Sequence, residues 1–491
     1  MTTQGHQPER HEPERHEPLR TLSKRNQWSY SSGTLGRDMV FTLVSLFILI
    51  YIQYTMALTA TQFATISGIM ILARIWDAIN DPMMGVIIEN SRFKSGKFRP
   101  WILIGALINF GITIALFTIR PAGWAFVGLF GVFYILWGMS YTMNDIAFWS
   151  LLPNLARGNE ERNKLTTLLI VFASIGQFLT GGLVPILVAG DAVAMYRNVA
   201  IFAAIMFLLC TLLTYFGVQE PEREDSDAVG LGEMIKVLKT NDQLRVSSFA
   251  VFLHTVAAEL FVALSLHFFY FNFGYGGEEV FFFTIAFAIG SLSATGAFPL
   301  LSKKMNRAVI INLAIAVAAS GYTLFFLTGT ALPQSLILIY LSAYMVFFGH
   351  NLFFVVLVIY IANTIEYHEY KTGHRRESVI FAMRPFMTKL GAAAQQGLVT
   401  LLLIISGVYG YTRRIAELEQ QKALGIADDI TEAANEVLSL STSGMKVALQ
   451  VGMAVMPFLA ILIAFIAIRR KYRLTEKTHE AMLQEIASRD H

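Results

Sequence analysis

Two aspartates and an asparagine lie within one helical turn of an otherwise apolar stretch. Asp77 and Asp81 are four residues apart, and Asn80 follows Asp77 by three, in the run ARIWDAINDP. Residues at these spacings share one face of a helix, so we expect their oxygen atoms to lie together. Carboxylate and amide oxygens are hard ligands that suit a small alkali cation. Pro82 removes an interior hydrogen-bond donor and would free a backbone carbonyl one turn back. The spacing therefore favours a cation site.

Two other roles fit the same residues. Arg74 lies one turn before Asp77 on the same face, and Lys389, in a later apolar stretch, is the natural counter-ion of these carboxylates. The cluster could lock helices together through Arg74 and Lys389, or it could relay a proton. Spacing favours cation binding and leaves structural pairing and proton relay open.

A second polar cluster lies in the run YTMNDIAFWS at 141–150, where Asp145 and Trp149 are one helical turn apart. A carboxylate accepts hydrogen bonds from sugar hydroxyls, and an indole ring packs on the apolar face of a pyranose. Thr142 is one turn before Asp145, so one helix can serve two ligands. The alternative is a tryptophan at the membrane interface and an aspartate paired with an arginine. The residues alone leave both interpretations open.

Further charged residues stand inside apolar stretches, where each costs about 2.5–3.5 kcal/mol at the centre of a span unless it has a partner or a wet cavity. Asp38 follows Arg37 and, by position alone, is consistent with a helix end cap. Glu259 is a single polar group, expected to make an interhelical hydrogen bond. Lys389 precedes Gly391 and three alanines, where helices can approach closely.

These residues must be positioned by membrane-spanning helices. Of 491 residues, 55% are hydrophobic and 15% are charged, against about 25% charged in soluble domains. This composition excludes a soluble multidomain enzyme and a disordered chain, and the single Cys210 excludes a disulfide scaffold. A net charge of +3 gives no case for nucleic-acid binding. No loop is large enough to house a soluble catalytic domain, so we expect a transporter and not an enzyme.

Twelve apolar stretches are long enough to cross a bilayer. We expect them near 35–57, 63–90, 101–119, 124–152, 165–188, 199–217, 246–273, 279–300, 308–328, 335–362, 378–410 and 444–468. The polar stretch 218–245 divides them six and six, which is the layout of a major facilitator transporter with its site near midplane. The predicted fold class is thus an all-α membrane protein of twelve transmembrane helices in two six-helix halves.

The same pattern predicts the domain organisation. We expect a disordered tail at 1–30, a six-helix bundle at 31–217, a linker at 218–245, a second bundle at 246–468 and a helical tail at 469–491. The other large loop, 411–443, is charged and helix-prone and should pack on the mouth of the protein. The short loops assigned to the cytoplasm carry thirteen Lys and Arg, against two on the other side. This bias predicts a multi-pass protein of the cell membrane with both termini in the cytoplasm.

The chain resembles the glycoside–pentoside–hexuronide:cation symporter family, and within it the melibiose-permease branch. The matching stretches are 73–82, Gly96-Lys97-Phe98-Arg99-Pro100-Trp101, Tyr134–Met139, Tyr141–Leu151, Glu369-Tyr370-Lys371 and Arg376-Glu377-Ser378. They occur in order and at matching spacing over roughly 30–410. The resemblance implies symport of a glycoside or related sugar with a monovalent cation by alternating access.

The resemblance also implies roles for single residues. One set would bind the coupling cation: Asp77, Asn80, Asp81 and Thr142. A second set would contact the sugar: Asp38, Tyr141, Asp145, Trp149, Phe354, Arg384 and Lys389. Lys389 would lie between the two sites and form a charge network with Arg74. The asparagine at position 80 leans toward Na⁺ or Li⁺, because members that use only protons tend to differ there. No cofactor is expected besides the coupling ion, Na⁺ or H⁺, and the protein is expected to be a monomer in the bilayer.

Departures from the branch affect the sugar side most. Ile170 stands where an arginine helps to bind galactosides, Phe354 replaces a tryptophan, and Arg384-Pro385 replaces a glutamine and a threonine. Arg384 adds a positive group, so an acidic glycoside is a second possible substrate. Proton-coupled or uncoupled transport by the same fold stays open as well. Lipid transport by this fold would need an apolar cleft in place of Trp149 and Asp38.

Overall fold

The computed structural model describes residues 23–91, 93–155, 159–220, 231–374 and 376–489. The first half of the chain forms one helical bundle. Its elements are α1 (Lys24–Ser31), α2 (Gly33–Thr42), the π-helix η1 (Leu43–Phe47), α3 (Ile48–Thr55), α4 (Ala60–Asn90), α5 (Arg99–Thr118), α6 (Gly123–Leu155), α7 (Asn159–Gly181), α8 (Val184–Val188) and α9 (Ala192–Gly217). The elements α2, η1 and α3 follow one another as the first membrane-spanning helix.

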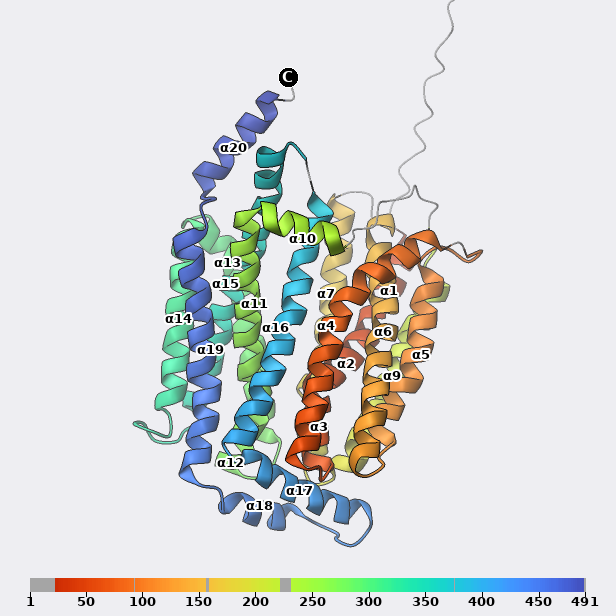
Figure 1. Cartoon of the computed structure of the whole chain (residues 1–491), viewed down its shortest axis with the longest axis vertical. Coiled ribbons are helices and arrows are strands. Elements are labelled where there is room, and N and C mark those ends of the chain that lie inside the picture. Colours follow the sequence, from red (N-terminus) through yellow and green to blue (C-terminus); the bar gives the residue numbers. More distant parts are fainter. Residues whose placement is uncertain (1–22, 92, 156–158, 221–230, 375, 490–491) are drawn as a thin grey trace, which may run out of the picture.

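The second half forms a second bundle beside the first (Figure 1). Helix α10 (Leu231–Thr240) leads into it. The remaining elements are α11 (Asp242–Ala263), α12 (Ser265–Phe273), α13 (Glu278–Ser302), α14 (Arg307–Leu327), α15 (Leu336–Thr372), α16 (Glu377–Ile405), α17 (Val408–Ala423), α18 (Thr431–Ser439), α19 (Ser443–Lys471) and α20 (Glu476–Arg489). The described residues contain no β-strand. The all-α class predicted from the sequence is confirmed.

Eleven segments are long and apolar enough to cross a membrane, and α4 is a twelfth if its two parts are taken as one span. These parts, Ala60–Asp77 and Ile79–Ile88, meet at an angle of 41°. Pro82 cannot donate a hydrogen bond to the carbonyl four residues earlier, which is the usual cause of such a bend. The bend therefore falls on the turn that carries Asp77, Asn80 and Asp81.

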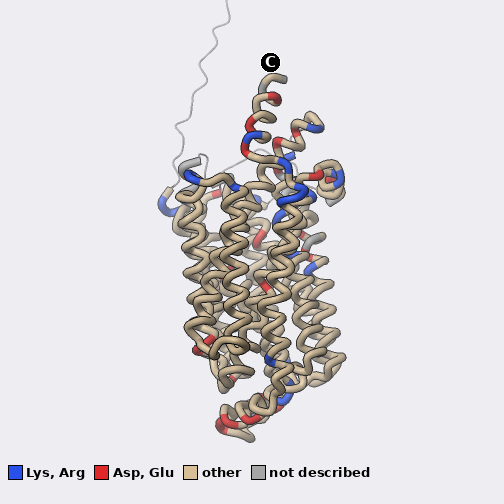
Figure 2. The backbone as a smooth tube through the Cα atoms, turned by 90° about the vertical axis from the view of Figure 1, so that its left-hand side faces the viewer, with Lys and Arg blue, Asp and Glu red and all other residues tan. Residues whose placement is uncertain are grey.

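Charged residues gather at the two ends of the molecule, and few lie between them (Figure 2). One end carries α1, α10 and α20, and we call it the linker end; the opposite end carries α17 and α18 (Figure 1). Many large apolar side chains stay exposed on the helices between the ends, such as Leu72, Leu292 and Ile337. An apolar belt between two charged ends identifies a multi-pass membrane protein.

Some boundaries differ from those predicted. The expected tail at 1–30 ends early, because Lys24–Ser31 forms α1, with the Ser23 hydroxyl accepting a hydrogen bond from the Asn26 N–H. Residues 1–22 of that tail lie outside the described residues. The linker 218–245 contains α10 and the first residues of α11. The loop 411–443 and the tail 469–491, both expected to be helical, hold most of α17, all of α18 and the whole of α20.

The motif at 96–100 is held by the first residues of the linker. The Glu220 carboxylate accepts hydrogen bonds from the backbone N–H groups of Lys97, Phe98 and Arg99 at 2.9–3.3 Å. These groups lie at the start of α5, where unpaired N–H groups attract an anion. Gly96 has a φ of 115°, and a Cβ there would collide with Glu220. The motif thus forms a cradle for a carboxylate.

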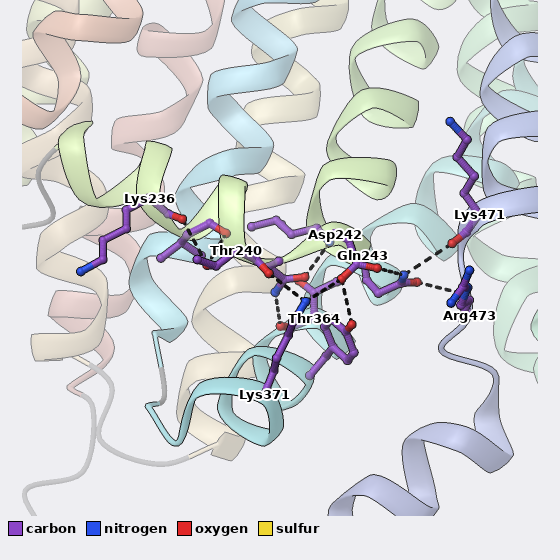
Figure 3. Close-up of polar contacts among 12 residues, drawn as sticks. Lys236, Thr240, Asp242, Gln243, Thr364, Lys371, Lys471 and Arg473 are labelled. Atoms are coloured by element: carbon purple, nitrogen blue, oxygen red, sulfur yellow. Dashed lines mark hydrogen bonds and ion pairs between the residues drawn. The ribbon is translucent and has the colours of Figure 1, made fainter.

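Polar contacts join the helices of the second bundle at the linker end (Figure 3). Asp242, the first residue of α11, accepts hydrogen bonds from Tyr367 at 2.8 Å and from Lys371 at 3.1 Å. Gln243 accepts from the Arg473 N–H at 2.7 Å. The end of α15 that carries Tyr367 and Lys371 is therefore anchored to α11 of the same bundle.

Candidate functional site

The predicted cation ligands come together from two helices of the first bundle. Helix α4 carries Asp77, Asn80 and Asp81, and the Thr142 hydroxyl on α6 donates to Asp81 Oδ1 at 3.1 Å. Gly138, one turn before Thr142, permits this approach, because a Cβ there would lie 2.6 Å from Asp77 Oδ1. Asp77 and Asn80 are buried, and the Asn80 Nδ2 has no hydrogen-bond partner among the described residues.

Basic side chains enclose these oxygens. Lys389, on α16 of the second bundle, forms an ion pair with Asp81 Oδ2. Arg74 lies 3.9 Å from Asp77 Oδ2 and donates to the Ser45 hydroxyl at 3.1 Å. We call Arg74, Asp77, Asn80, Asp81, Thr142 and Lys389 the cation cluster. The ion pairs expected if the cluster locks helices together are therefore present. They use the carboxylates of Asp77 and Asp81, the same groups that would bind a cation.

The donor set limits the kind of ion that would fit. No group of three or more His, Cys, Asp or Glu side chains suited to a metal ion occurs in the described part of the chain. The candidate set has two carboxylates with an amide and a hydroxyl oxygen. All four are oxygen donors, the ligand type that hard cations prefer.

The predicted sugar residues of the first bundle gather around Arg37. Its guanidinium lies 3.3 Å from Asp38 Oδ2 and 3.2 Å from Asp145 Oδ1. It also lies over the rings of Phe148 and Trp149, with 4.6 and 5.0 Å to their centroids. Asp38 sits inside α2 and is buried, so it is no end cap. Asp145 keeps a side-chain exposure of 33% and is the more accessible carboxylate.

The other oxygen of Asp38 is also occupied. The amide Nε2 of Gln177, on α7, donates to Asp38 Oδ1 at 2.9 Å. We call Arg37, Asp38, Asp145, Trp149 and Gln177 the sugar cluster. Lys389 belongs to the cation cluster through its ion pair with Asp81. It also interacts electrostatically with Asp145 and so links the cation cluster to the sugar cluster.

The remaining predicted sugar residues are less closely joined. Tyr141 stacks on Trp137 with 5.5 Å between ring centroids, on the same helix as Asp145. Phe354 stacks on His254 at 5.1 Å within the second bundle. The Arg384 side chain is exposed and makes no hydrogen bond or ion pair within the described ranges. The structure therefore brings Asp38, Asp145 and Trp149 together but shows no direct contact from Phe354 or Arg384 to them.

Two residues of the sugar cluster were not predicted. In the sequence, Arg37 is distinguished only by its position before Asp38 near a helix end. Gln177 follows Gly176 within an apolar stretch, and an amide at that position is the signal that could have found it. Glu259, predicted to make an interhelical hydrogen bond, acts electrostatically on Arg74 across the two bundles.

Polar contacts also join the bundles at the α17 end. The Gln53 side chain donates to the Thr412 hydroxyl at 3.1 Å and contacts His267 Nε2 at 2.7 Å through its oxygen. The Tyr409 hydroxyl donates to the Leu58 carbonyl at 3.0 Å. In this conformation α3 and α17 are therefore bound to each other.

Two six-helix bundles with charged clusters at mid-depth define a transporter of the major facilitator type. A sequence model described as MFS/sugar transport protein matches residues 29–476, and the chain belongs to that family. Its members are transporters of sugars, so the expectation that the protein is not an enzyme is confirmed, as is the predicted family resemblance.

Named relatives are similar over most of the chain. The lactose permease of Lactobacillus delbrueckii subsp. bulgaricus is 26% identical over 93% of this chain and 72% of its own length. The raffinose carrier protein of Pediococcus pentosaceus is 28% identical over 93% of this chain and 70% of its own. The isoprimeverose transporter of Lactiplantibacillus pentosus is 21% identical over 78% and 80%.

Solved structures share the fold. A bacterial homologue of the lysosomal transporter Spinster, in an inward-facing conformation, superposes with a TM-score of 0.65 at 12% identity, covering 91% of this chain and 98% of that one. A D-xylose–proton symporter gives a TM-score of 0.57 at 15% identity, covering 86% and 98%. These similarities confirm the major facilitator fold.

Proposed function

We propose that the protein imports a glycoside together with a monovalent cation, with Na⁺ favoured, by alternating access. One observation carries this proposal: the two clusters hold more negative than positive charge. Four carboxylates, Asp38, Asp77, Asp81 and Asp145, face the three cations Arg37, Arg74 and Lys389. A bound monovalent cation would reduce this excess.

The shared carboxylate of Asp81 supports coupling between cation and sugar. Because Asp81 binds both Thr142 and Lys389, a cation that enters the cluster competes with the Lys389 ammonium. Lys389 then interacts more strongly with Asp145, on which it already acts. Coupling of this kind between two sites is typically worth about 1–3 kcal/mol and is reciprocal. Sugar and cation would therefore favour the same closed state.

The side chains of the sugar cluster fit a carbohydrate. Trp149 is half-exposed and can cover the apolar face of a pyranose, while Asp145 accepts hydrogen bonds from hydroxyls. The relatives named for lactose, raffinose and isoprimeverose support an oligosaccharide or glycoside as the proposed substrate. The charged surroundings of Arg37 argue against lipid transport, which requires an apolar cleft.

A second candidate is transport of an acidic sugar, driven by protons or by its own gradient. The exposed Arg384 side chain, which makes no ion pair within the described ranges, favours this candidate, because a free guanidinium pairs well with a carboxylate.

The proposal also includes an orientation in the membrane. We assign the linker end to the cytoplasm, because the loops placed there carry thirteen Lys and Arg.

Uptake into proteoliposomes tests the proposal. Purified protein is reconstituted, and uptake of radiolabelled lactose, raffinose, isoprimeverose and methyl glucuronide is measured under inward gradients of Na⁺, Li⁺, K⁺ or H⁺. We expect Na⁺ or Li⁺, and not K⁺, to drive accumulation of at least one neutral sugar. Accumulation of the glucuronide driven by H⁺ alone would support the second candidate. Transport indifferent to every gradient would contradict cation coupling.

A substitution of Asp81 tests whether this carboxylate binds the cation. Asp81→Asn keeps the hydrogen bond from Thr142 but removes the charge that attracts the cation, so we expect Na⁺-driven accumulation to be lost. Asp429→Asn, which changes an exposed carboxylate outside the spans, serves as the control. An Asp81→Asn protein with full Na⁺ stimulation would show that this carboxylate does not bind the cation.

A further inference from the structure

Gln177 is placed next to Asp38 by a close approach of two helices. A Cβ on Gly176 would collide with the Leu35 carbonyl oxygen, so glycine lets α7 lie directly on α2. The Thr34 hydroxyl on α2 also bonds the Leu169 carbonyl on α7 at 3.0 Å. The residue after Gly176 therefore reaches Asp38, and this is Gln177, whose Nε2 lies 2.9 Å from Asp38 Oδ1.

Asp38 itself offers little to a ligand. Its Oδ1 accepts from Gln177 and its Oδ2 from Arg37 at 3.3 Å, and its side chain is only 11% exposed. Gln177, in contrast, is exposed. Of these two residues, Gln177 therefore presents the more accessible polar group, its side-chain amide.

The hydrogen bond to Asp38 determines the orientation of this amide. A carboxylate only accepts hydrogen bonds, so the nitrogen of Gln177 must face Asp38 and the oxygen must point away. One of the two N–H groups is used by Asp38, and the second N–H and the Oε1 stay available. The Oε1 makes no hydrogen bond with any residue that the structure describes. A free donor and a free acceptor side by side match two neighbouring sugar hydroxyls, one of which accepts while the other donates.

The sequence of α7 supports a direct role. Ile170, two turns earlier on the same helix, is 58% exposed and can offer no hydrogen bond to a sugar. Gln177 is thus a residue of α7 that brings a polar contact to the sugar cluster.

We propose that Gln177 is a specificity-determining residue that binds a vicinal pair of sugar hydroxyls, and that Asp38 acts through it as a positioning residue. This inference rests on the proposed function, since it names the contact that would recognise the glycoside. It changes the role of Asp38 from a direct ligand to a support for Gln177.

Counterflow with lactose, raffinose and isoprimeverose tests the inference. Gln177→Leu should raise the KM for the transported sugar about tenfold, the effect of about 1.4 kcal/mol in binding, and leave the Na⁺ concentration for half-activation unchanged. Gln177→Asn keeps the amide but shortens its reach, and should raise the KM in the same direction. Gln334→Leu is the control, because the Gln334 amide donates to the Asn272 carbonyl at the α17 end and belongs to neither cluster. Wild-type KM values in Gln177→Leu would overturn the inference.

A double variant separates the two roles. If Asp38 acts through Gln177, adding Asp38→Asn to Gln177→Leu should raise the KM by no more than about twofold, whereas independent contacts would multiply their effects. Multiplicative effects would overturn the positioning role. Thermal unfolding of each variant shows whether a change in KM comes from a damaged fold. If the wild-type protein exchanges none of the three sugars, both the proposed function and this inference fail. If the wild-type protein exchanges a sugar and Gln177→Leu has the same KM for it, only this inference fails.

Discussion

The Glu419 carboxylate of α17 accepts a hydrogen bond of 2.8 Å from the backbone N–H of Ala192, the first residue of α9. Its other oxygen accepts from the Tyr275 hydroxyl. Ala192 belongs to the first bundle and Tyr275 to the second, so Glu419 joins the two bundles at the α17 end. The side chain is fully buried, with 0% of the residue exposed. Asp191, Lys422, Tyr196 and Tyr270 are the other titratable groups that act on it.

This contact predicts a pH-dependent opening of the α17 end. Glu419 lies outside the membrane-spanning helices, and burial raises its pKa above the ordinary value of 4.5, although the bonds from Tyr275 and Ala192 act in the opposite direction. When α17 separates from α9, the carboxylate meets water and regains its ordinary pKa. The closed state therefore binds the proton more tightly. Lowering the pH through the interval between the two pKa values should favour closure, and raising it should favour opening.

Cysteine labelling measures this opening. Cys210 is the only native cysteine, and it is replaced by alanine. Thr55→Cys then reports on a fully buried position next to α17. Labelling by an impermeant maleimide, corrected for the reagent's own pH dependence, should slow as the pH falls toward 4.5. Glu419→Gln should be slow and independent of pH, while Glu417→Gln, which alters an exposed ion pair on the same helix, should behave like the parent. An unchanged pH profile in Glu419→Gln would refute the prediction.

The Gln53 side chain should hold the same end closed. Gln53→Ala removes the side-chain partner of the buried His267 Nε2 and the donor to the Thr412 hydroxyl, which still bonds the Tyr409 carbonyl. An unsatisfied buried polar group costs about 1–3 kcal/mol, and this cost falls on the closed state alone. We expect labelling of Thr55→Cys to become faster by about tenfold or more. If the labelling rate stays at that of the parent, Gln53 does not stabilise closure.

The cradle around Glu220 should contribute to stability. Glu220→Ala removes the acceptor of three backbone N–H groups at the start of α5, and loss of a helix N-terminal acceptor costs about 0.5–2 kcal/mol. Gly96→Ala should destabilise the same loop because of its positive φ. Both variants should lower the melting temperature in detergent, whereas Gly68→Ala, at a position where a Cβ meets open space, should not. Equal melting temperatures would exclude the cradle as a stabilising element.

Arg37 should be required for both fold and binding. Arg37→Leu leaves Asp38 and Asp145 without their shared cation, and removal of one partner of a buried pair costs about 3–5 kcal/mol. We expect a lower melting temperature and no measurable sugar binding, with partial recovery in Arg37→Lys. The measurements are thermal unfolding and equilibrium binding of the transported sugar. Wild-type binding by a folded Arg37→Leu protein would show that the guanidinium is dispensable.

Much of the fold follows from local patterns in the sequence. Apolar stretches of spanning length predict twelve helices, because each stretch is read independently of the others. The spacing of Asp77, Asn80 and Asp81 also predicts which oxygens share a face, since a helix determines neighbours three and four residues apart. Helix α1, in contrast, was not predicted, because a short polar helix has no apolar period to reveal it.

The tertiary structure alone decided which distant residues meet. The pairs Asp81–Lys389, Asp38–Gln177 and Ala192–Glu419 join residues that are 308, 139 and 227 positions apart. Such contacts depend on how helices pack, and in particular on Gly138 and Gly176, where missing side chains let two helices touch. Periodicity within one helix contains no information about the partner that it faces. The sequence therefore predicted the chemistry of each helix face, and packing determined which faces form one site.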